Sequence, residues 1–220
     1  MPLQAVLFDL DGTLVDSNDY HVAAWEVAFR EAGHAITTEQ IHGQIGKGGD
    51  NLVPALLPEL GADAVEALGK AQGDAFREQY RDRIHPFPGA RDLMARVAQD
   101  GRQVVLASSA GSEDIDHYVE LLGAKGLIAF ATGKDDVEHS KPDPDIFAAA
   151  VRKAGVAAAD CLVIGDTPYD VQAAKACGID AVGLLSGGFG EDVLREAGAI
   201  AVYADVAALL AGYDGSPLAR

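Results

Sequence analysis

The chain has 220 residues, of which 49% are hydrophobic and 23% charged; this suits one domain of ordinary size or a core that carries a smaller insert. Acidic residues outnumber basic residues by 34 to 17, so the formal net charge is −17. Nucleic acids and anionic membranes bind clusters of Lys and Arg, and no such cluster is visible in the sequence. The composition therefore argues against nucleic acid and membrane as partners, and it implies no protein partner.

The sequence offers no sign of a membrane segment or of export. It contains no run of about 18 apolar residues, and its start, MPLQAVLFDLDG, lacks the basic flank and cleavage site of a signal peptide. Cys161 and Cys177 are too few for a disulfide framework, so we expect two buried free thiols. These features predict a cytoplasmic protein.

Short apolar runs rich in Val, Leu and Ile predict six strands. Most of them lack the alternation of polar and apolar residues that marks a half-exposed strand, so we expect strands buried on both faces. Helical patterns separate the strands from residue 86 onward, and several of these end in glycine. The pattern predicts an α/β fold, a Rossmann-like doubly wound parallel sheet covered by helices. The predicted strands lie at about 4–9, 103–108, 128–131, 161–165, 180–184 and 200–203.

Residues 16–85 interrupt this alternation with helical sequence alone. One amphipathic helix is expected in DSNDYHVAAWEVAFREAG, a second from about Thr37, and a long third over about 63–83. The glycine-rich stretch QIGKGGDNL between them is expected to be a flexible loop. We therefore predict a core domain of residues 1–15 and 86–220 with an inserted α-helical cap domain at 16–85, and a frayed C-terminal GSPLAR.

Polar side chains follow several predicted strands. In an open parallel sheet the carboxyl ends of the strands lie at one edge, where ligands bind, so we expect these groups to converge. Two aspartates end the first strand two positions apart, which places both side chains on one face, where two charges about 4 Å apart repel by about 4 kcal/mol. The converging set consists of Asp9, Asp11, Ser108, Ser109, Lys141, Asp166 and Asp170.

Several carboxylates in one place need a counter-charge, and Mg²⁺ commonly binds one or two carboxylates together with phosphate oxygens. A calcium loop of the EF-hand type does not fit, because Tyr20 stands where that loop has its last acidic ligand. Simpler roles stay open for two residues at this stage: Thr13 can cap the turn after the first strand, and Asp170 can cap the helix that follows it.

Four ordered motifs carry a resemblance to a known family. DLDGTLVD, the serine after VVLA, SKPDP and IGDTPYD resemble the motifs of the haloacid dehalogenase-like (HAD) hydrolase superfamily. The resemblance implies that Asp9 is a nucleophile forming an aspartyl-phosphate and that Asp11 is the general acid and base. It also implies a Mg²⁺ ion and a set of residues that bind the phosphorylated substrate. The metal residues would be Asp9, Asp11 (through its carbonyl), Asp166 and Asp170, and the phosphate or substrate residues Thr13, Ser108, Ser109, Lys141, His21 and Lys47.

The resemblance narrows the activity without naming a substrate. The dehalogenase branch lacks the second aspartate of the first motif, so Asp11 argues against carbon–halogen cleavage. The glycine-rich setting of Lys47 does not suggest the desolvation that a Schiff-base lysine of the phosphonate hydrolases needs. The first choice is a Mg²⁺-dependent phosphatase of a small phosphorylated metabolite, such as a phosphoglycolate-like compound or a sugar phosphate.

Two alternatives remain. DSNDYHVAAW resembles the first cap helix of the β-phosphoglucomutase branch, where a histidine at the position of His21 helps to orient the acid/base aspartate. The cap loop of this chain has no arginine for a second phosphate, and Lys47 offers only a point charge. The other alternative is a non-catalytic phosphate-binding protein, which the complete set of motifs disfavours.

Overall fold

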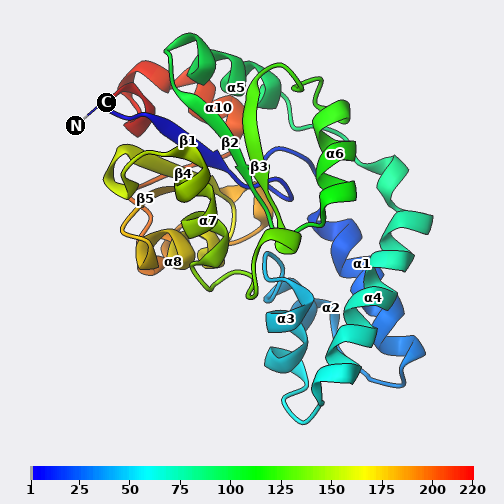
Figure 1. The fold of residues 1–220 in the computed structure, drawn as a ribbon. Coiled ribbons are helices and arrows are strands. Elements are labelled where there is room, and N and C mark those ends of the chain that lie inside the picture. Colours follow the sequence, from blue (N-terminus) through cyan, green and yellow to red (C-terminus); the bar gives the residue numbers. More distant parts are fainter. Residues whose placement is uncertain (1) are drawn as a thin grey trace.

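The core of the molecule is a parallel sheet of six strands in the order β3-β2-β1-β4-β5-β6 (Figure 1). The computed structural model describes residues 2–220. All six predicted strands are present, with ends that differ from the expected ones by no more than one residue, and the doubly wound α/β fold is confirmed. The strands are β1 (Ala5–Phe8), β2 (Gln103–Ala107), β3 (Ile128–Thr132), β4 (Cys161–Gly165), β5 (Asp180–Leu184) and β6 (Ala201–Tyr203).

Helices cover both faces of this sheet, because alternate residues of each strand point to opposite sides. Val6 and Phe8 of β1 belong to one hydrophobic cluster, and Ala5 and Leu7 belong to the other. The first cluster includes residues of α5 (Ala90–Gln99), α6 (Ser112–Leu121) and α10 (Val206–Ala211); the second includes residues of α7 (Asp145–Ala154), α8 (Pro168–Ala176) and α9 (Glu191–Ala197).

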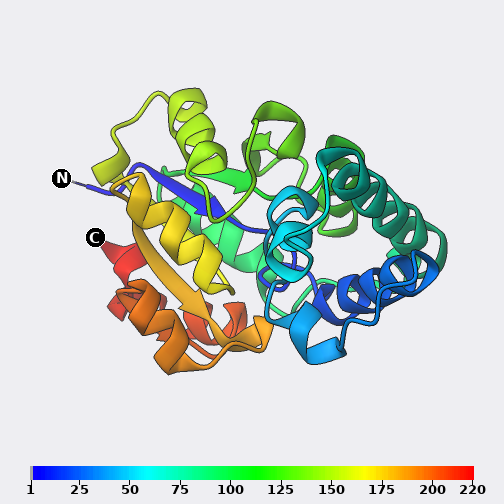
Figure 2. The same ribbon diagram turned by 90° about the horizontal axis from the view of Figure 1, so that it is seen from below.

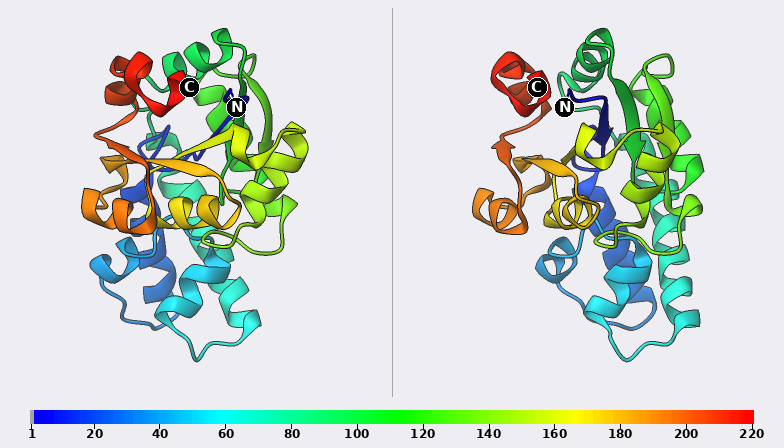
Figure 3. Two further views of the ribbon diagram at one scale, coloured as in Figure 1. Left: turned by 90° about the vertical axis from the view of Figure 1, so that its left-hand side faces the viewer. Right: turned by 60° about the vertical axis from the view of Figure 1, so that its left-hand side comes forward.

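The segment between β1 and α5 is helical and packs around a cluster of its own. Trp25, Phe29, Ile41, Leu52 and Leu68 are among the residues that fill it. Figures 2 and 3 show these helices gathered as one group beside the core, below the sheet in Figure 3. They are α1 (Asn18–Glu31), α2 (Thr38–His42), α3 (Gly49–Leu56) and α4 (Ala62–Gln79), followed by a 3₁₀ turn at Arg81–Arg83. We call this group the cap.

Two chain crossings join the cap to the core and lie side by side. Val15 forms an antiparallel bridge with Pro86, and the amide of Asp16 donates to the carbonyl of His85 at 2.9 Å. The chain leaves the core and returns to it at this point. We therefore propose that the boundaries between the core domain and the cap domain lie at residues 15/16 and 85/86.

Three local expectations differ from the structure. Helix α3 occupies part of the stretch expected to be a flexible loop, which Gly48 and Gly49 had suggested. Helix α10 was not predicted. The C-terminal residues are not frayed, because the side chain of Leu218 is fully buried in the first cluster.

Two simpler features complete the description. Among the described residues, no helix combines the length and the apolar character needed to cross a bilayer. Both cysteines are free thiols; Cys161 is buried as expected, whereas Cys177 is only partly buried.

Candidate active site

The register of the three central strands brings the predicted residues together. Phe8, the last residue of β1, lies opposite Leu106 of β2 and Ile164 of β4. The residues that follow these strands therefore emerge at one edge of the sheet, the edge that faces the cap (Figure 1). Close to it, the amide of Asp9 continues the sheet by donating to the carbonyl of Ile164 at 2.9 Å.

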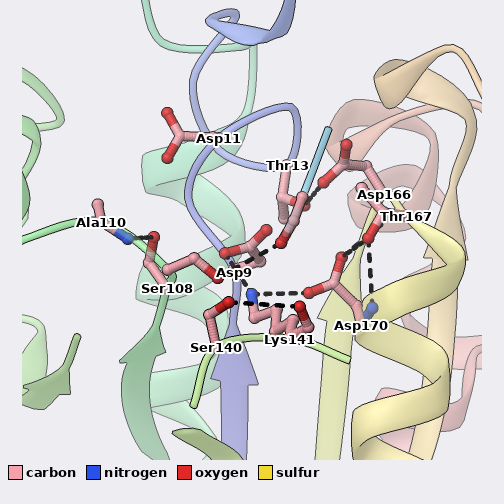
Figure 4. A network of polar contacts seen from close by, with 12 residues as sticks. Asp9, Asp11, Thr13, Ser108, Ala110, Ser140, Lys141, Asp166, Thr167 and Asp170 are labelled. Atoms are coloured by element: carbon pink, nitrogen blue, oxygen red, sulfur yellow. Dashed lines mark hydrogen bonds and ion pairs between the residues drawn. The ribbon is translucent and has the colours of Figure 1, made fainter. Parts of the chain in front are cut away.

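Asp9 and Lys141 form a buried ion pair at this edge. The carboxylate of Asp9 is 2.7 Å from Nζ of Lys141, and the lysine side chain is fully buried (Figure 4). Burial raises the pKa of Asp9 well above its usual range; Lys141 opposes this effect, and the nearby Asp170 and Asp166 add to it. A negative charge on Asp9 therefore depends on positive charge next to it.

Asp170 holds Lys141 from the other side. Its Oδ1 is 2.7 Å from the lysine Nζ, while its Oδ2 accepts the hydroxyl of Thr167 at 2.6 Å and the amide of Thr167 at 3.1 Å. Burial opposes the charge of Lys141, but Asp170 and Asp9 outweigh it and raise the lysine pKa above its ordinary value. Asp170 thus caps helix α8 and positions Lys141 at the same time.

Asp166 is held by two side chains from the first part of the chain. Its Oδ1 accepts the hydroxyl of Thr13 at 2.7 Å, and its Oδ2 accepts the amide of Asn18 at 2.9 Å. Burial, with the charge of Asp170, raises the pKa of Asp166 to about 7. Gly12 lies so close that a Cβ atom there would be 2.2 Å from Oδ2, and its φ of +72° also favours glycine. Sequence reasoning did not find Asn18, because no local pattern marks this first residue of helix α1 as a partner of Asp166.

Three carboxylates meet in a geometry that suits a cation. Asp9, Asp166 and Asp170 each offer an oxygen, and these atoms lie within 4.8 Å of one another in a buried setting. Lys141 contributes one positive charge to three carboxylates, so an excess of two negative charges remains if all are ionised. A divalent ion with oxygen ligands would balance this charge and would lower the raised pKa values of Asp9 and Asp166.

Asp11 stands apart from this cluster (Figure 4) and has its own partners. Its Oδ1 accepts the hydroxyl of Ser17 at 2.6 Å and lies 3.0 Å from Nε2 of His21. Although burial opposes its charge, His21 and the hydrogen bond from Ser17 lower the pKa of Asp11 below its usual value. The two aspartates of the first motif are thus placed in different environments, one beside the cation-binding cluster and one beside a histidine.

The cap orients His21. Its ring stacks on Phe76 of α4 with centroids 4.0 Å apart, and the amide nitrogen of Gln72 lies 3.2 Å from Nδ1. An ionised Asp11 can only accept, so Nε2 of His21 is the donor in their contact and Nδ1 can accept from Gln72. Gln72 was not found from the sequence, because no local pattern distinguishes it from an ordinary helix residue.

The two serines after β2 differ in their roles. Ser108 is buried, and its Oγ accepts the amide of Ala110 at 3.1 Å (Figure 4), so this bond does not use its hydroxyl hydrogen. Ser109 instead donates to the carbonyl of Gly46 in the cap at 3.3 Å. The structure therefore separates Ser109 from the carboxylate cluster.

Lys47 lies on the short connection between α2 and α3. Its Nζ donates to Gln44 at 2.6 Å and stands 4.5 Å from the ring centroid of Tyr169. Partial burial lowers its pKa, whereas the glycine-rich setting had not suggested desolvation. The side chain is held between cap and core.

Similarities to known proteins agree with this geometry. The family model described as haloacid dehalogenase-like hydrolase matches residues 6–184. A phosphoglycolate phosphatase of Rhodospirillum rubrum is 30% identical over 215 residues, which covers 94% of this chain and 89% of that protein.

Two solved structures show the same architecture. A hydrolase from Pseudomonas syringae superposes with a TM-score of 0.90 at 35% identity, covering 96% of this chain and 98% of that one. A β-phosphoglucomutase from Clostridium difficile superposes with a TM-score of 0.79 at 21% identity, covering 93% and 92%, and indicates the fold alone. The family model matches residues 6–184, and the motifs and the residues at the sheet edge agree with that match. This chain therefore belongs to the haloacid dehalogenase-like hydrolase family.

Proposed function

We propose that the protein is a Mg²⁺-dependent phosphatase that hydrolyses a small phosphorylated metabolite through an aspartyl-phosphate intermediate. The observation that carries this proposal is the contrast between its two neighbouring aspartates. Asp9 is buried beside Lys141, where an anion can be bound, whereas the carboxylate of Asp11 lies within hydrogen-bond distance of the proton donors Ser17 and His21. Nucleophilic attack needs the first environment, and proton transfer needs the second.

The reaction follows from these positions. An oxygen of Asp9 attacks phosphorus, and the bond from phosphorus to the ester oxygen breaks. The pKa of Asp11 is lowered in the free protein, but the negative charge of a bound phosphate favours the protonated form, which gives its proton to the leaving oxygen. Asp11 then takes a proton from water, whose oxygen attacks the phosphorus and releases Asp9 and inorganic phosphate. Lys141 and Ser108 would bind the phosphoryl oxygens, where fixed positive charge and hydrogen-bond donors act most strongly.

The metal-site residues fit Mg²⁺. Carboxylate oxygens of Asp9 and Asp166, with the carbonyl of Asp11, would hold the ion, and Asp170 would act indirectly, because its oxygens already bind Lys141 and Thr167. Bound there, the ion would neutralise charge on the nucleophile and on the phosphoryl group. Thr13 and Asn18 keep Asp166 in place, so Thr13 supports the metal residue rather than the phosphate.

The substrate class rests on the relatives and on the position of the site beside the cap. The R. rubrum protein is a phosphoglycolate phosphatase, and the edge of the sheet that carries the site faces the cap (Figure 1). Of the two cap residues expected to bind the substrate, His21 contacts Asp11 and Lys47 lies against Tyr169. A small phosphorylated metabolite is therefore the proposed substrate, and a cytoplasmic location without nucleic-acid, membrane or protein partners stays a prediction of the sequence.

Mg²⁺ is expected to be required for turnover and to stabilise the fold. At a concentration about 100 times the dissociation constant, a ligand of the native state adds about 2.7 kcal/mol, which for a chain of this size raises the melting temperature by about 5–10 °C. Thermal unfolding and p-nitrophenyl phosphate hydrolysis with Mg²⁺ or EDTA measure both effects. Asp166→Asn should lose both responses. Full activity in excess EDTA would refute the metal requirement.

The same assay addresses the non-catalytic alternative. A phosphate-binding protein would bind inorganic phosphate without releasing p-nitrophenol in Mg²⁺. Release of p-nitrophenol at a rate that Asp9→Asn abolishes excludes it.

A second candidate function, phosphosugar mutase, is favoured by the contact between His21 and Asp11. A mutase keeps its aspartyl-phosphate from water while a bisphosphate intermediate turns around, and it needs a firm cation for the distal phosphate. Lys47 is already bound to Gln44 and stacked on Tyr169, so it is not free to hold a distal phosphate. We therefore expect water to hydrolyse the aspartyl-phosphate before the phosphoryl group returns to the sugar. With β-glucose 1-phosphate and a trace of the 1,6-bisphosphate, inorganic phosphate should form faster than glucose 6-phosphate; the reverse order would establish the mutase.

A further inference from the structure

One segment of the cap touches the core at two loops and at the first turn of helix α8. Each core residue in these contacts is adjacent in sequence to a residue proposed above to act in the site, namely Asp170, Ser108 and Lys141. The contacts are hydrogen bonds between Tyr169 and the carbonyl of Gly43, between Ser109 and the carbonyl of Gly46, and between Ser140 and the amide of Gly48. Residues 43–51 therefore meet the core where its catalytic loops are.

The contact at Ser140 is the most extensive of the three. Its amide donates to Oδ2 of Asp50 at 2.9 Å, and its hydroxyl donates to Oδ1 of the same carboxylate at 2.5 Å. Its Oγ also accepts the amide of Gly48 at 2.9 Å, and its carbonyl accepts the side-chain amide of Asn51 at 2.9 Å. Ser140 is buried, so every polar group of this core residue is satisfied by the cap.

This contact lies one peptide bond from Lys141. The lysine ammonium must reach 2.7 Å from both Asp9 and Asp170, and its backbone position is set by the loop of Ser140. Asn51 also donates to Oδ2 of Asp143 at 3.0 Å, so the cap holds the loop on both sides of the lysine.

The fit at Gly48 indicates how close this contact is. A Cβ atom there would lie 2.6 Å from Oδ1 of Asp50 and 2.6 Å from Oγ of Ser140. The φ of Gly48 is −72°, which any residue adopts, so the close approach to Asp50 and Ser140 is what excludes a side chain.

We propose that Asp50 is a positioning residue. Through both of its bonds to Ser140, it holds Lys141 in contact with Asp9 and Asp170. Lys141 reaches this position fully only when the cap is docked on the core. The proposal rests on the proposed function in that Lys141 acts on the transferring phosphoryl group. A displacement of about 1 Å in a catalytic group can lower a rate about a hundredfold.

Asp50→Asn tests the proposal kinetically. Asparagine has one acceptor oxygen, so at least one bond to Ser140 is lost, and kcat for p-nitrophenyl phosphate should fall by about ten- to a hundredfold, with KM changed less than about threefold. Asp63→Asn is the matched control, because Asp63 is also in the first turn of a cap helix, α4, but is exposed. Ser140→Ala removes one hydroxyl and keeps the backbone bond, and should lower kcat in the same direction by less.

Amide hydrogen exchange provides a readout that does not depend on turnover. Exchange at Ser140 should become at least about tenfold faster in Asp50→Asn and stay unchanged in Asp63→Asn. If the unmodified protein shows no phosphatase activity but exchange responds in this way, the proposed function fails and the cap contact stands. If exchange at Ser140 accelerates while kcat is unchanged in both Asp50→Asn and Ser140→Ala, the contact is structural and the positioning role is overturned. Unchanged exchange at Ser140 also overturns it.

Discussion

Asp9→Asn is expected to lower kcat by more than about a thousandfold while the protein stays folded, because an amide cannot attack phosphorus and loss of a nucleophile removes most of the rate enhancement. Burial and the nearby Asp166 and Asp170 raise the pKa of Asp9, with Lys141 acting in the opposite direction. The folded state thus opposes a charge at this position. A neutral side chain of the same shape should therefore leave the melting temperature of the metal-free protein equal or higher.

Steady-state kinetics and thermal unfolding measure the two effects. Asp116→Asn, an exposed aspartate on α6, is the control and should change neither. If Asp9→Asn keeps more than about a tenth of the activity, Asp9 is not the nucleophile. A melting temperature far below that of the unmodified protein would instead mean that its ion pair with Lys141 outweighs the repulsion.

Lys141→Met is expected to abolish turnover and to destabilise the fold. The lysine ammonium lies 2.7 Å from both Asp9 and Asp170 with no exposure to solvent, so its removal leaves buried carboxylates without their cation. Breaking a buried pair in this way typically costs about 3–5 kcal/mol. The free energy of unfolding from urea titration should fall by about that amount.

A surface lysine provides the comparison. Lys153 pairs with Asp136 at 2.8 Å, but its side chain is 40% exposed, so Lys153→Met should cost no more than about 1 kcal/mol. Excess Mg²⁺ should return part of the stability to Lys141→Met without returning activity, since the ion neutralises the carboxylates but does not replace the phosphate-binding ammonium. Equal stability losses in the two variants would show that the buried carboxylates carry no net charge in the folded protein.

The sheet and the edge that carries the site were predictable from local sequence. Apolar runs such as QVVLA and CLVIG are short and lack alternation. A strand of this kind has apolar side chains on both faces, so it is stable only where both faces are buried. Parallel strands bring their carboxyl ends to one edge, and this rule places Asp9, Ser108 and Asp166 together. The fold class and the central acidic cluster therefore follow from the local sequence.

Side-chain partners across the cap were decided only by the tertiary structure. Asn18 bonds Asp166 across 148 residues of chain, and Asp50 bonds Ser140 across 90. Neither pair has a sequence spacing that marks it, because a hydrogen bond of this kind depends on the distance and angle at which the cap packs against the core. The same reason explains why Gly48 and Gly49 suggested a flexible loop: the contacts that hold residues 48–51 in place come from Ser140, on a different part of the chain.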